Sequence, residues 1–161
     1  MMDDILSGLG AAFGFAALHF INDSNLLQDY LGVTSCLCPP LGAVAVLLFC
    51  MPNVPASQPK SVIGGHVIAG LVSYAIVESN TSFYPELLAV SITITLMSLL
   101  KVVHPPAGAY AFFFTNKRLA VKGIIAPGLI GAIILIIAQQ IFFTITKQIK
   151  GNGGGSKKKK A

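Results

Sequence analysis

The sequence predicts an all-α polytopic membrane protein built from two internal repeats, and two observations support this prediction. Of the 161 residues, 54% are hydrophobic and 11% are charged, whereas soluble domains carry about 25% charged residues. The pattern x-Pro-Pro-x-Gly-Ala-x-Ala, followed by an apolar run, begins at Cys38 and again at His104. Because the two copies lie 66 positions apart (104 − 38), we interpret them as equivalent positions of a repeat.

The formal charge of +5 arises mainly at the end of the chain. Without the four lysines at 157–160, seven basic residues face six acidic ones, a net charge of +1. The Gly- and Lys-rich segment 151–161 resembles a flexible linker or an engineered addition. A native tail that binds anionic lipid is the alternative, and nothing indicates nucleic-acid binding. We therefore predict one transmembrane domain over residues 1–150, with repeats at about 5–78 and 84–147.

Four apolar segments have roughly the length that a transmembrane helix needs. The first contains glycines among alanines, a composition that permits close helix packing in membranes. We predict about four full transmembrane helices, at residues 5–21, 62–78, 86–103 and 123–146. Between them we expect polar or basic loops at residues 22–29, 52–61, 78–86 and 115–122, and extended lead-in segments at 31–38 and 101–104.

Two shorter pieces, residues 39–51 and 105–115, are predicted to be half-helices that begin at prolines. Proline suits the first helical position, and the residue before it is pushed toward extended geometry. About 10 residues span roughly 15 Å, half of a bilayer core. A helix N-terminus with free N–H groups attracts anions. The first free N–H groups are expected on Leu41, Gly42 and Ala43, and on Ala107, Gly108 and Ala109.

The direction of the repeats is left open by the sequence. If each half-helix completes a crossing, the repeats are inverted; if each is re-entrant, they are parallel. The inverted arrangement is favoured because it brings two half-helix N-termini together at the bilayer midplane, where such transporters bind their substrates. It places the basic residues Lys117, Arg118 and Lys122 outside, against the positive-inside rule.

Three blocks of the sequence resemble the HPP family of integral membrane proteins. The segment from His104 to Ala109 resembles the family signature, and the run from Pro40 to Phe49 resembles its first block. The family's second block is similar to Gln58-Pro59-Lys60 followed by Ile63-Gly64-Gly65-His66. Together the blocks cover roughly residues 35–115. Where the family usually has arginine, this chain has Lys60, which lacks bidentate geometry.

The resemblance implies a small bacterial or plastid membrane protein, usually described with four transmembrane helices. Cyanobacterial and plant members are associated with nitrite transport, in the plastid case across the chloroplast envelope. The expected location is therefore a bacterial cell membrane, in particular that of a cyanobacterium, or the chloroplast envelope for a plastid protein. The expected partners are a small anion and the lipid bilayer, with a homo-oligomer left open.

We predict a transporter of a small monovalent anion, with nitrite implied by the resemblance. One helix terminus contributes about 0.3–1 kcal/mol, up to ~2 when partly buried, whereas desolvating an ion costs several kcal/mol. Two facing termini and a donor from His104 are therefore expected to act together. The candidate binding residues are Cys38, Pro39, Pro40, Leu41, Gly42, Ala43, Gln58, Lys60, Gly64, Gly65, His66, His104, Pro105, Pro106, Ala107, Gly108 and Ala109.

Each motif also has a structural interpretation. In this interpretation the prolines only break a helix, and His104 satisfies a backbone carbonyl. Gly64, Gly65 and His66 are then packing and capping residues, and Gln58 and Lys60 are interfacial. Whether His104 would act as a neutral donor or as an imidazolium that moves with the anion is open.

Two other functions remain as alternatives. One is a non-transporting membrane scaffold or sensor subunit. The other is a metal-binding membrane protein that uses Cys36, Cys38 and His104. No serine or cysteine lies beside a base in a convincing pattern, so we predict no enzyme, no cofactor and no metal site.

Overall fold

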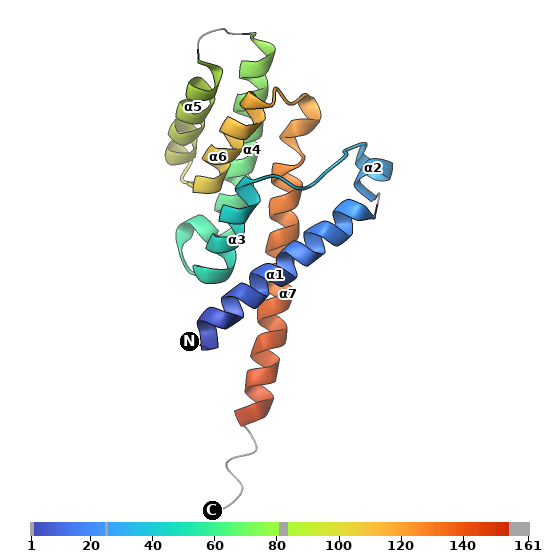
Figure 1. Cartoon of the computed structure of the whole chain (residues 1–161). Coiled ribbons are helices and arrows are strands. Elements are labelled where there is room, and N and C mark those ends of the chain that lie inside the picture. Colours follow the sequence, from blue (N-terminus) through green and yellow to red (C-terminus); the bar gives the residue numbers. More distant parts are fainter. Residues whose placement is uncertain (1, 25, 81–83, 155–161) are drawn as a thin grey trace, which may run out of the picture.

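The computed structural model describes residues 2–24, 26–80 and 84–154, and every regular element in these ranges is a helix (Figure 1). The chain is an all-helical polytopic protein, as predicted. The first half contains α1 (Met2–Asp23), α2 (Leu26–Leu31), α3 (Pro40–Cys50), η1 (Pro55–Ser57) and α4 (Pro59–Glu78). The second half contains α5 (Pro85–Leu99), α6 (Pro105–Asn116), η2 (Val121–Ile124) and α7 (Gly128–Gly154).

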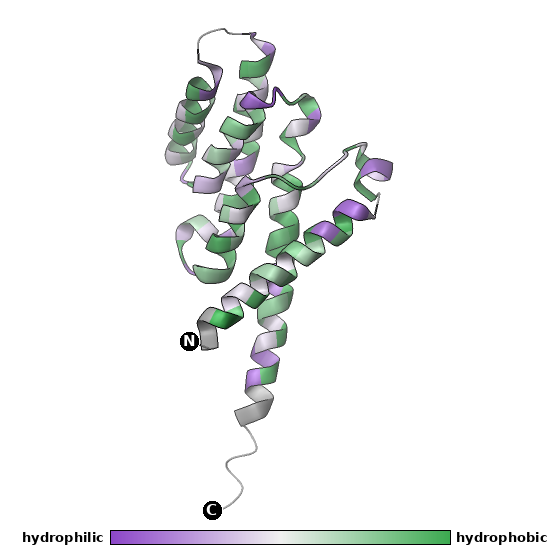
Figure 2. Ribbon diagram, in the orientation of Figure 1, coloured by the Kyte–Doolittle hydropathy of each residue, from purple (hydrophilic) through white to green (hydrophobic). Residues whose placement is uncertain are grey.

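Within the described ranges, three segments are long and apolar enough to cross a membrane: Ile5–Asp23, Pro59–Glu78 and Val121–Lys150. In Figure 2 hydrophobic residues dominate α7 until its C-terminal part, where hydrophilic residues appear. The prediction of a fourth full helix over residues 86–103 is wrong. The helix there, α5, has 15 residues, about 22 Å, and it is followed by a turn at Leu100 and Lys101 and then by non-helical residues 102–104. Hydropathy alone does not show where the helix ends, because the residues on both sides of its end are mostly apolar.

Both Pro-initiated half-helices are confirmed. α3 has 11 residues and α6 has 12, so each is about 16–18 Å long. His104 precedes α6 in extended geometry, with φ −138° and ψ 99°, as expected for a residue before proline. The equivalent lead-in at residues 32–38 is also non-helical. The prolines therefore set where each half-helix begins.

The directions of the helices follow an inverted order (Figure 1). α1 and α4 run upward in that view with α3 running downward, whereas α5 and α7 run downward with α6 running upward. α3 and α6 contact each other, as do α4 and α7. The other main contacts come in corresponding pairs if α1 is equivalent to α5, α3 to α6 and α4 to α7. The α1–α3 contact then corresponds to α5–α6, α1–α7 to α4–α5, and α3–α7 to α4–α6.

Close approaches between helices also recur at the 66-position spacing. A Cβ on Gly65 of α4 would lie 3.1 Å from the Cβ of Ala107 in α6, and a Cβ on Gly131 of α7 would collide with Leu41 of α3. Both positions of the second contact differ from those of the first by 66 (131 − 65 and 107 − 41). These contacts are those expected of an inverted repeat, and the repeat itself stays a prediction.

Two hydrogen bonds from polar side chains also join the α4–α6 and α3–α7 pairs. Ser73 of α4 donates through Oγ to the carbonyl of Ala111 in α6 at 3.2 Å. Gln139 of α7, again 66 positions after Ser73, donates through Nε2 to the carbonyl of Leu48 in α3 at 3.0 Å. The central α3–α6 pair is thus held from both sides, by α4 and by α7.

Several predicted boundaries need correction. The expected loop at residues 22–29 includes most of α2, whose Leu26, Leu27, Tyr30 and Leu31 make a short helix among polar residues. The expected loop at 52–61 contains η1 and the start of α4, which begins at Pro59. α7 continues to Gly154, so part of the predicted tail is helical. Residues 155–161 of that tail lie outside the described residues.

Candidate functional site

Two histidines lie side by side in the interior of the bundle. His66 is on α4 and His104 immediately precedes α6, and both side chains have 0% exposure. Their ring centroids are 5.2 Å apart. The ring of Tyr110 on α6, also fully buried, lies 5.7 Å from that of His66. We call His66 and His104 the histidine pair.

Backbone contacts fix which nitrogen of each ring carries hydrogen. His66 Nδ1 lies 2.9 Å from the carbonyl oxygen of Val62, one turn earlier on α4. His104 Nδ1 lies 2.8 Å from the carbonyl oxygen of Ala56 in η1. A carbonyl only accepts hydrogen bonds, so Nδ1 is the donor in both rings. Each neutral ring therefore has its lone pair on Nε2.

Both Nε2 atoms are buried and have no hydrogen-bond partner. Buried polar atoms are usually paired, so these two atoms are candidates for binding a water, an ion or a ligand. The prediction that His104 satisfies a carbonyl holds for one of its two nitrogens. The other nitrogen remains available, together with its counterpart on His66.

The short distance between the rings limits the charge that the histidine pair can hold. Two positive charges 5.2 Å apart repel by about 3 kcal/mol at an effective dielectric constant of ~20. Protonation of one ring therefore strongly opposes protonation of the other. The pair therefore resists holding two protons at once.

The packing of α4 against α6 holds the pair in place. Gly65, next to His66, lets the two helices approach, since a Cβ there would lie 2.9 Å from the Cβ of His104. On α6, Tyr110 donates its hydroxyl hydrogen to the carbonyl of Gly123 in η2. The site is thus positioned by α4, α6 and the two short 3₁₀ turns.

The half-helix N-termini lie near the pair, but fewer of their N–H groups are free than predicted. α3 contacts α6, and Cys38 packs against the apolar cluster that contains Ala107 and Tyr110. The N–H groups of Leu41, Gly42 and Ala107 donate to the carbonyls of Cys38, Pro39 and His104. The expectation that these three N–H groups are free is therefore wrong, because the first turn of each helix closes with a tight turn-type bond.

Several small residues near the starts of the half-helices face outward, whereas Ala107 is buried. Gly42, Ala43 and Ala109 are exposed, and Gly108 is half-buried. Gly108 and Ala109 line an apolar groove of about 510 Å³ between α5 and α6. Pro39 and Pro105 are exposed, whereas Pro40 and Pro106 are buried. The predicted site residues therefore divide between the interior and the outer surface.

The second predicted block also divides. Gly65 and His66 are buried at the pair, and Gly64 packs against Val102 of the lead-in. Gln58 and Lys60 are exposed at the start of α4, where the side chain of Gln58 donates to the carbonyl of Pro52 at 3.1 Å. These two residues therefore lie at the surface, whereas the histidines are buried.

One buried polar residue was not anticipated. Thr93 on α5 has 0% exposure, and its hydroxyl has no hydrogen-bond partner. It lies one helical turn before Met97, whose sulfur approaches Gly65. Threonine is common in apolar helices, so no signal in the sequence distinguishes this one.

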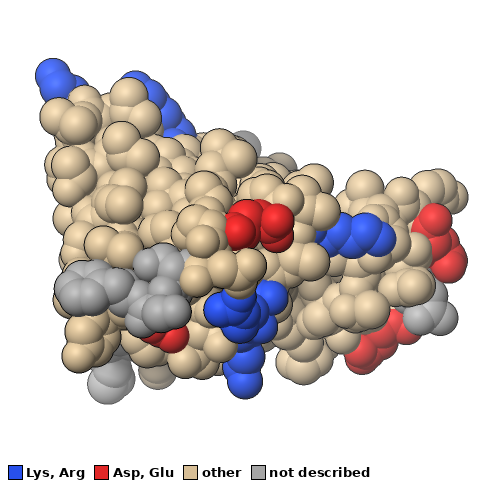
Figure 3. Space-filling view, turned by 90° about the horizontal axis from the view of Figure 1, so that it is seen from above, with Lys and Arg blue, Asp and Glu red and all other residues tan. Residues whose placement is uncertain are grey.

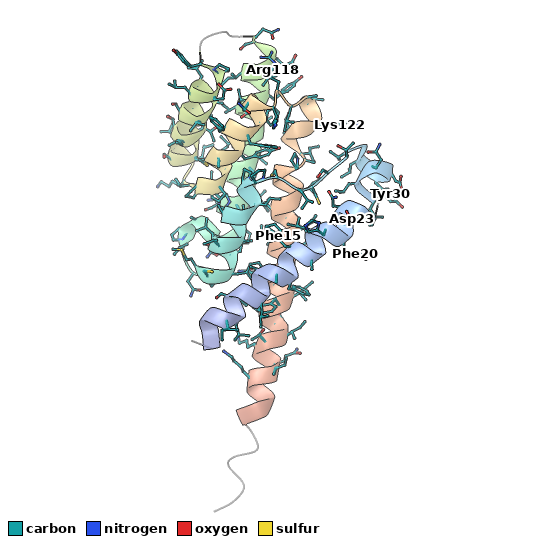
Figure 4. All side chains as sticks on the ribbon, in the orientation of Figure 1. Phe15, Phe20, Asp23, Tyr30, Arg118 and Lys122 are labelled. Carbon is teal, nitrogen blue, oxygen red and sulfur yellow. The ribbon has the colours of Figure 1, made fainter. Side chains whose placement is uncertain are left out.

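The charged side chains lie away from the histidine pair. In Figure 4, Arg118 and Lys122 lie in the connection between α6 and α7. Arg118 donates to the side chain of Asn80 at 2.7 Å, and Lys122 to the carbonyl of Gly32 at 2.8 Å. Figure 3, seen from this end, shows basic and acidic side chains scattered over a mainly uncharged surface. Both basic residues have structural partners that join distant segments.

The described residues contain no group of three or more His, Cys, Asp or Glu side chains placed to hold a metal ion. The three cysteines are free thiols. Cys36 instead makes a weak hydrogen bond to the carbonyl of Leu18 at 3.5 Å. The arrangement of Cys36, Cys38 and His104 therefore gives no support to the metal-binding alternative.

Comparison with known proteins agrees with this architecture. A family described as HPP, transmembrane region, matches residues 1–150. A transmembrane protein of Dictyostelium discoideum is 34% identical over 138 residues, which make up 80% of this chain and 47% of that protein. Another from the same organism is 36% identical over 74 residues, 43% of this chain and 24% of that protein.

This chain thus spans less than half the length of these two relatives. No solved structure matches it. The apolar helices and the family match together identify an integral membrane protein. The chain belongs to the HPP family of transmembrane proteins.

Proposed function

We propose that this chain transports a small monovalent anion across a membrane, with nitrite as the first candidate. The observation that carries the proposal is the histidine pair, whose two Nε2 atoms are buried without partners beside the contact of the half-helices α3 and α6. Polar groups at membrane depth are costly and usually line a substrate path. We assign the pair as the centre of that path.

The helices around the pair support an anion as the ligand. The N-terminal ends of α3 and α6 carry the positive ends of their dipoles, and the described residues place no carboxylate against either imidazole. An inverted helix order with half-helices meeting near the middle is the arrangement that many transporters use for their substrate sites.

Nitrite is proposed from the resemblance to nitrite-associated HPP proteins. The site itself favours no anion over nitrate, formate or chloride. A bacterial cell membrane or a chloroplast envelope remains the proposed location, and we propose no enzymatic activity. Because the chain covers less than half of the matched relatives, the activity of a longer protein would include parts not present here.

The test is nitrite uptake into proteoliposomes. We expect saturable uptake above empty vesicles, and a loss of at least tenfold in the His66→Gln and His104→Gln variants, since glutamine cannot become a cation. His19→Gln is the matched control, because His19 is exposed on α1, far from the pair in sequence and on another helix. Uptake no higher than in empty vesicles would contradict the function. Uptake unchanged in both site variants would remove the site assignment.

A further inference from the structure

We infer that the histidine pair takes up one proton together with the anion, so that the protein moves an anion and a proton as one unit. The inference rests on the proposed function and deepens it. It states that the anion crosses the membrane together with one proton, and that His66 and His104 bind this proton.

The polarity of the hydrogen bonds determines what the neutral pair can bind. Val62 and Ala56 each accept the Nδ1 hydrogen of one ring, so a neutral ring offers only a lone pair at Nε2. An anion such as nitrite also offers only lone pairs, and two acceptors repel each other. A proton on Nε2 reverses this, because the ring keeps its carbonyl bond and gains an N–H donor for the anion.

The backbone does not replace this donor. Three of the N–H groups expected to face an anion, those of Leu41, Gly42 and Ala107, already donate to backbone carbonyls. The Tyr110 hydroxyl hydrogen is donated to Gly123. Protonation of the histidine pair is therefore the most direct source of a hydrogen bond to the anion.

Charge balance makes the proton and the anion depend on each other. Neither imidazole has a carboxylate partner within the described part of the chain. A buried cation without a partner is strongly disfavoured, so the protonated pair requires the anion, and the anion requires the proton. On α3, α4, α5, α6, η2, α7 and the lead-in segments, the other ionisable groups are Cys36, Cys38, Cys50, Lys60, Tyr74, Glu78, Glu86, Lys101, Tyr110, Lys122, Lys147 and Lys150.

None of those groups offers a ready countercharge. Lys60, Glu78 and Lys101 are exposed to the surroundings of the protein, and Glu86 lies in the first turn of α5, at the opposite end of that helix from the lead-in to His104. The rings are 5.2 Å apart, so a second proton is opposed by the first. The pair therefore exchanges one proton per monovalent anion, and the transported unit is electrically neutral.

The test is calorimetric titration of the detergent-solubilised full chain with sodium nitrite, in two buffers that differ in their enthalpy of ionisation. The difference between the observed heats counts the protons exchanged on binding. We expect one proton taken up per nitrite bound. Linkage then requires that Kd increase about tenfold for each unit by which pH rises above the range where the free pair is protonated.

Variants test the assignment to the histidine pair. The double variant His66→Gln, His104→Gln should take up no proton, and His19→Gln should behave as the unmodified protein. Circular dichroism and gel filtration establish that each variant is folded. If the double variant does not fold, the proton count and the pH slope of the unmodified protein still decide the question.

The outcomes separate the inference from the function on which it rests. Nitrite binding and uptake without proton exchange, and with a pH-independent Kd, would overturn the inference and leave the transport function intact. Tighter binding at higher pH, or binding of ammonium or zinc in preference to nitrite, would show that the lone pairs serve a cation and would overturn both. Absence of nitrite binding and of uptake would overturn the proposed function itself.

Discussion

At the scale of single residues, Gly65 determines how closely α4 approaches the start of α6. A Cβ at this position would lie 2.9 Å from the Cβ of His104 and 3.1 Å from that of Ala107. Neither of these atoms is at the flexible end of a side chain, so the backbones themselves would have to separate. The hydrogen of glycine is what allows the histidine pair to form.

Replacement of Gly65 by alanine should therefore destabilise the protein by about 1–3 kcal/mol, the usual cost of overpacking. Gly8→Ala is the matched control, because no atom lies within 4 Å of a Cβ built there and alanine favours helix. Thermal unfolding in detergent measures both variants. Equal melting temperatures for the two would show that the contact at Gly65 is looser than the structure indicates.

The sequence marked the two histidines of the pair individually but did not predict that they touch. The repeated Pro-Pro pattern marked His104, and the second block marked His66, because polar residues stand out in apolar segments. Their contact depends on how α4 packs on α6, which local patterns do not encode. The same limitation applies to Thr93, which becomes unusual only through its burial. Conversely, Gln58 and Lys60 share a motif with His66 but lie on the surface.

At the scale of elements, the prolines made the half-helices predictable. α3 begins at Pro40 and α6 begins at Pro105, since proline fits the first helical turn and blocks an earlier start. The length of α5 was not predictable in this way. Residues 86–103 are apolar throughout most of their length, but α5 ends at Leu99 in a turn at Leu100 and Lys101, where Lys101 has φ 54°.

The short turn η2 is tied to α6 by one side chain. Tyr110 is fully buried, and its hydroxyl donates to the carbonyl of Gly123. In Tyr110→Phe this carbonyl loses its partner inside the protein, so we expect a loss of about 1–3 kcal/mol in stability. Tyr30→Phe, at a residue that is 82% exposed, should leave the melting temperature unchanged. Similar melting temperatures for both variants would mean that another group replaces the bond.

At the scale of the whole molecule, the contacts relate the two halves of the chain as if they were interchangeable. The contacts keep the same pattern when α1 is exchanged for α5, α3 for α6 and α4 for α7. Each half contributes the helix that supports the half-helix of the other, α4 for α6 and α7 for α3. The two halves therefore pack against each other through reciprocal contacts, as the predicted inverted repeat requires.

The inverted arrangement makes a distinct prediction about the two sides of the membrane. Cysteines introduced at Asn80 and Lys117 should react with an impermeant thiol reagent from the same side, and those at Asn53 and Lys147 from the opposite side. These variants are made in a background in which the three native cysteines are replaced by serine. Labelling of the Asn80 and Lys117 positions from opposite sides would instead indicate parallel repeats with re-entrant half-helices.

The most direct measurement is nitrite uptake into proteoliposomes under one driving force at a time, with a pH-sensitive dye inside. The account predicts that an acidic exterior at zero membrane potential drives uptake above that of empty vesicles and acidifies the interior in step with nitrite entry. It also predicts that a membrane potential at equal pH drives no uptake. Uptake that follows the potential and leaves the internal pH unchanged would contradict the account.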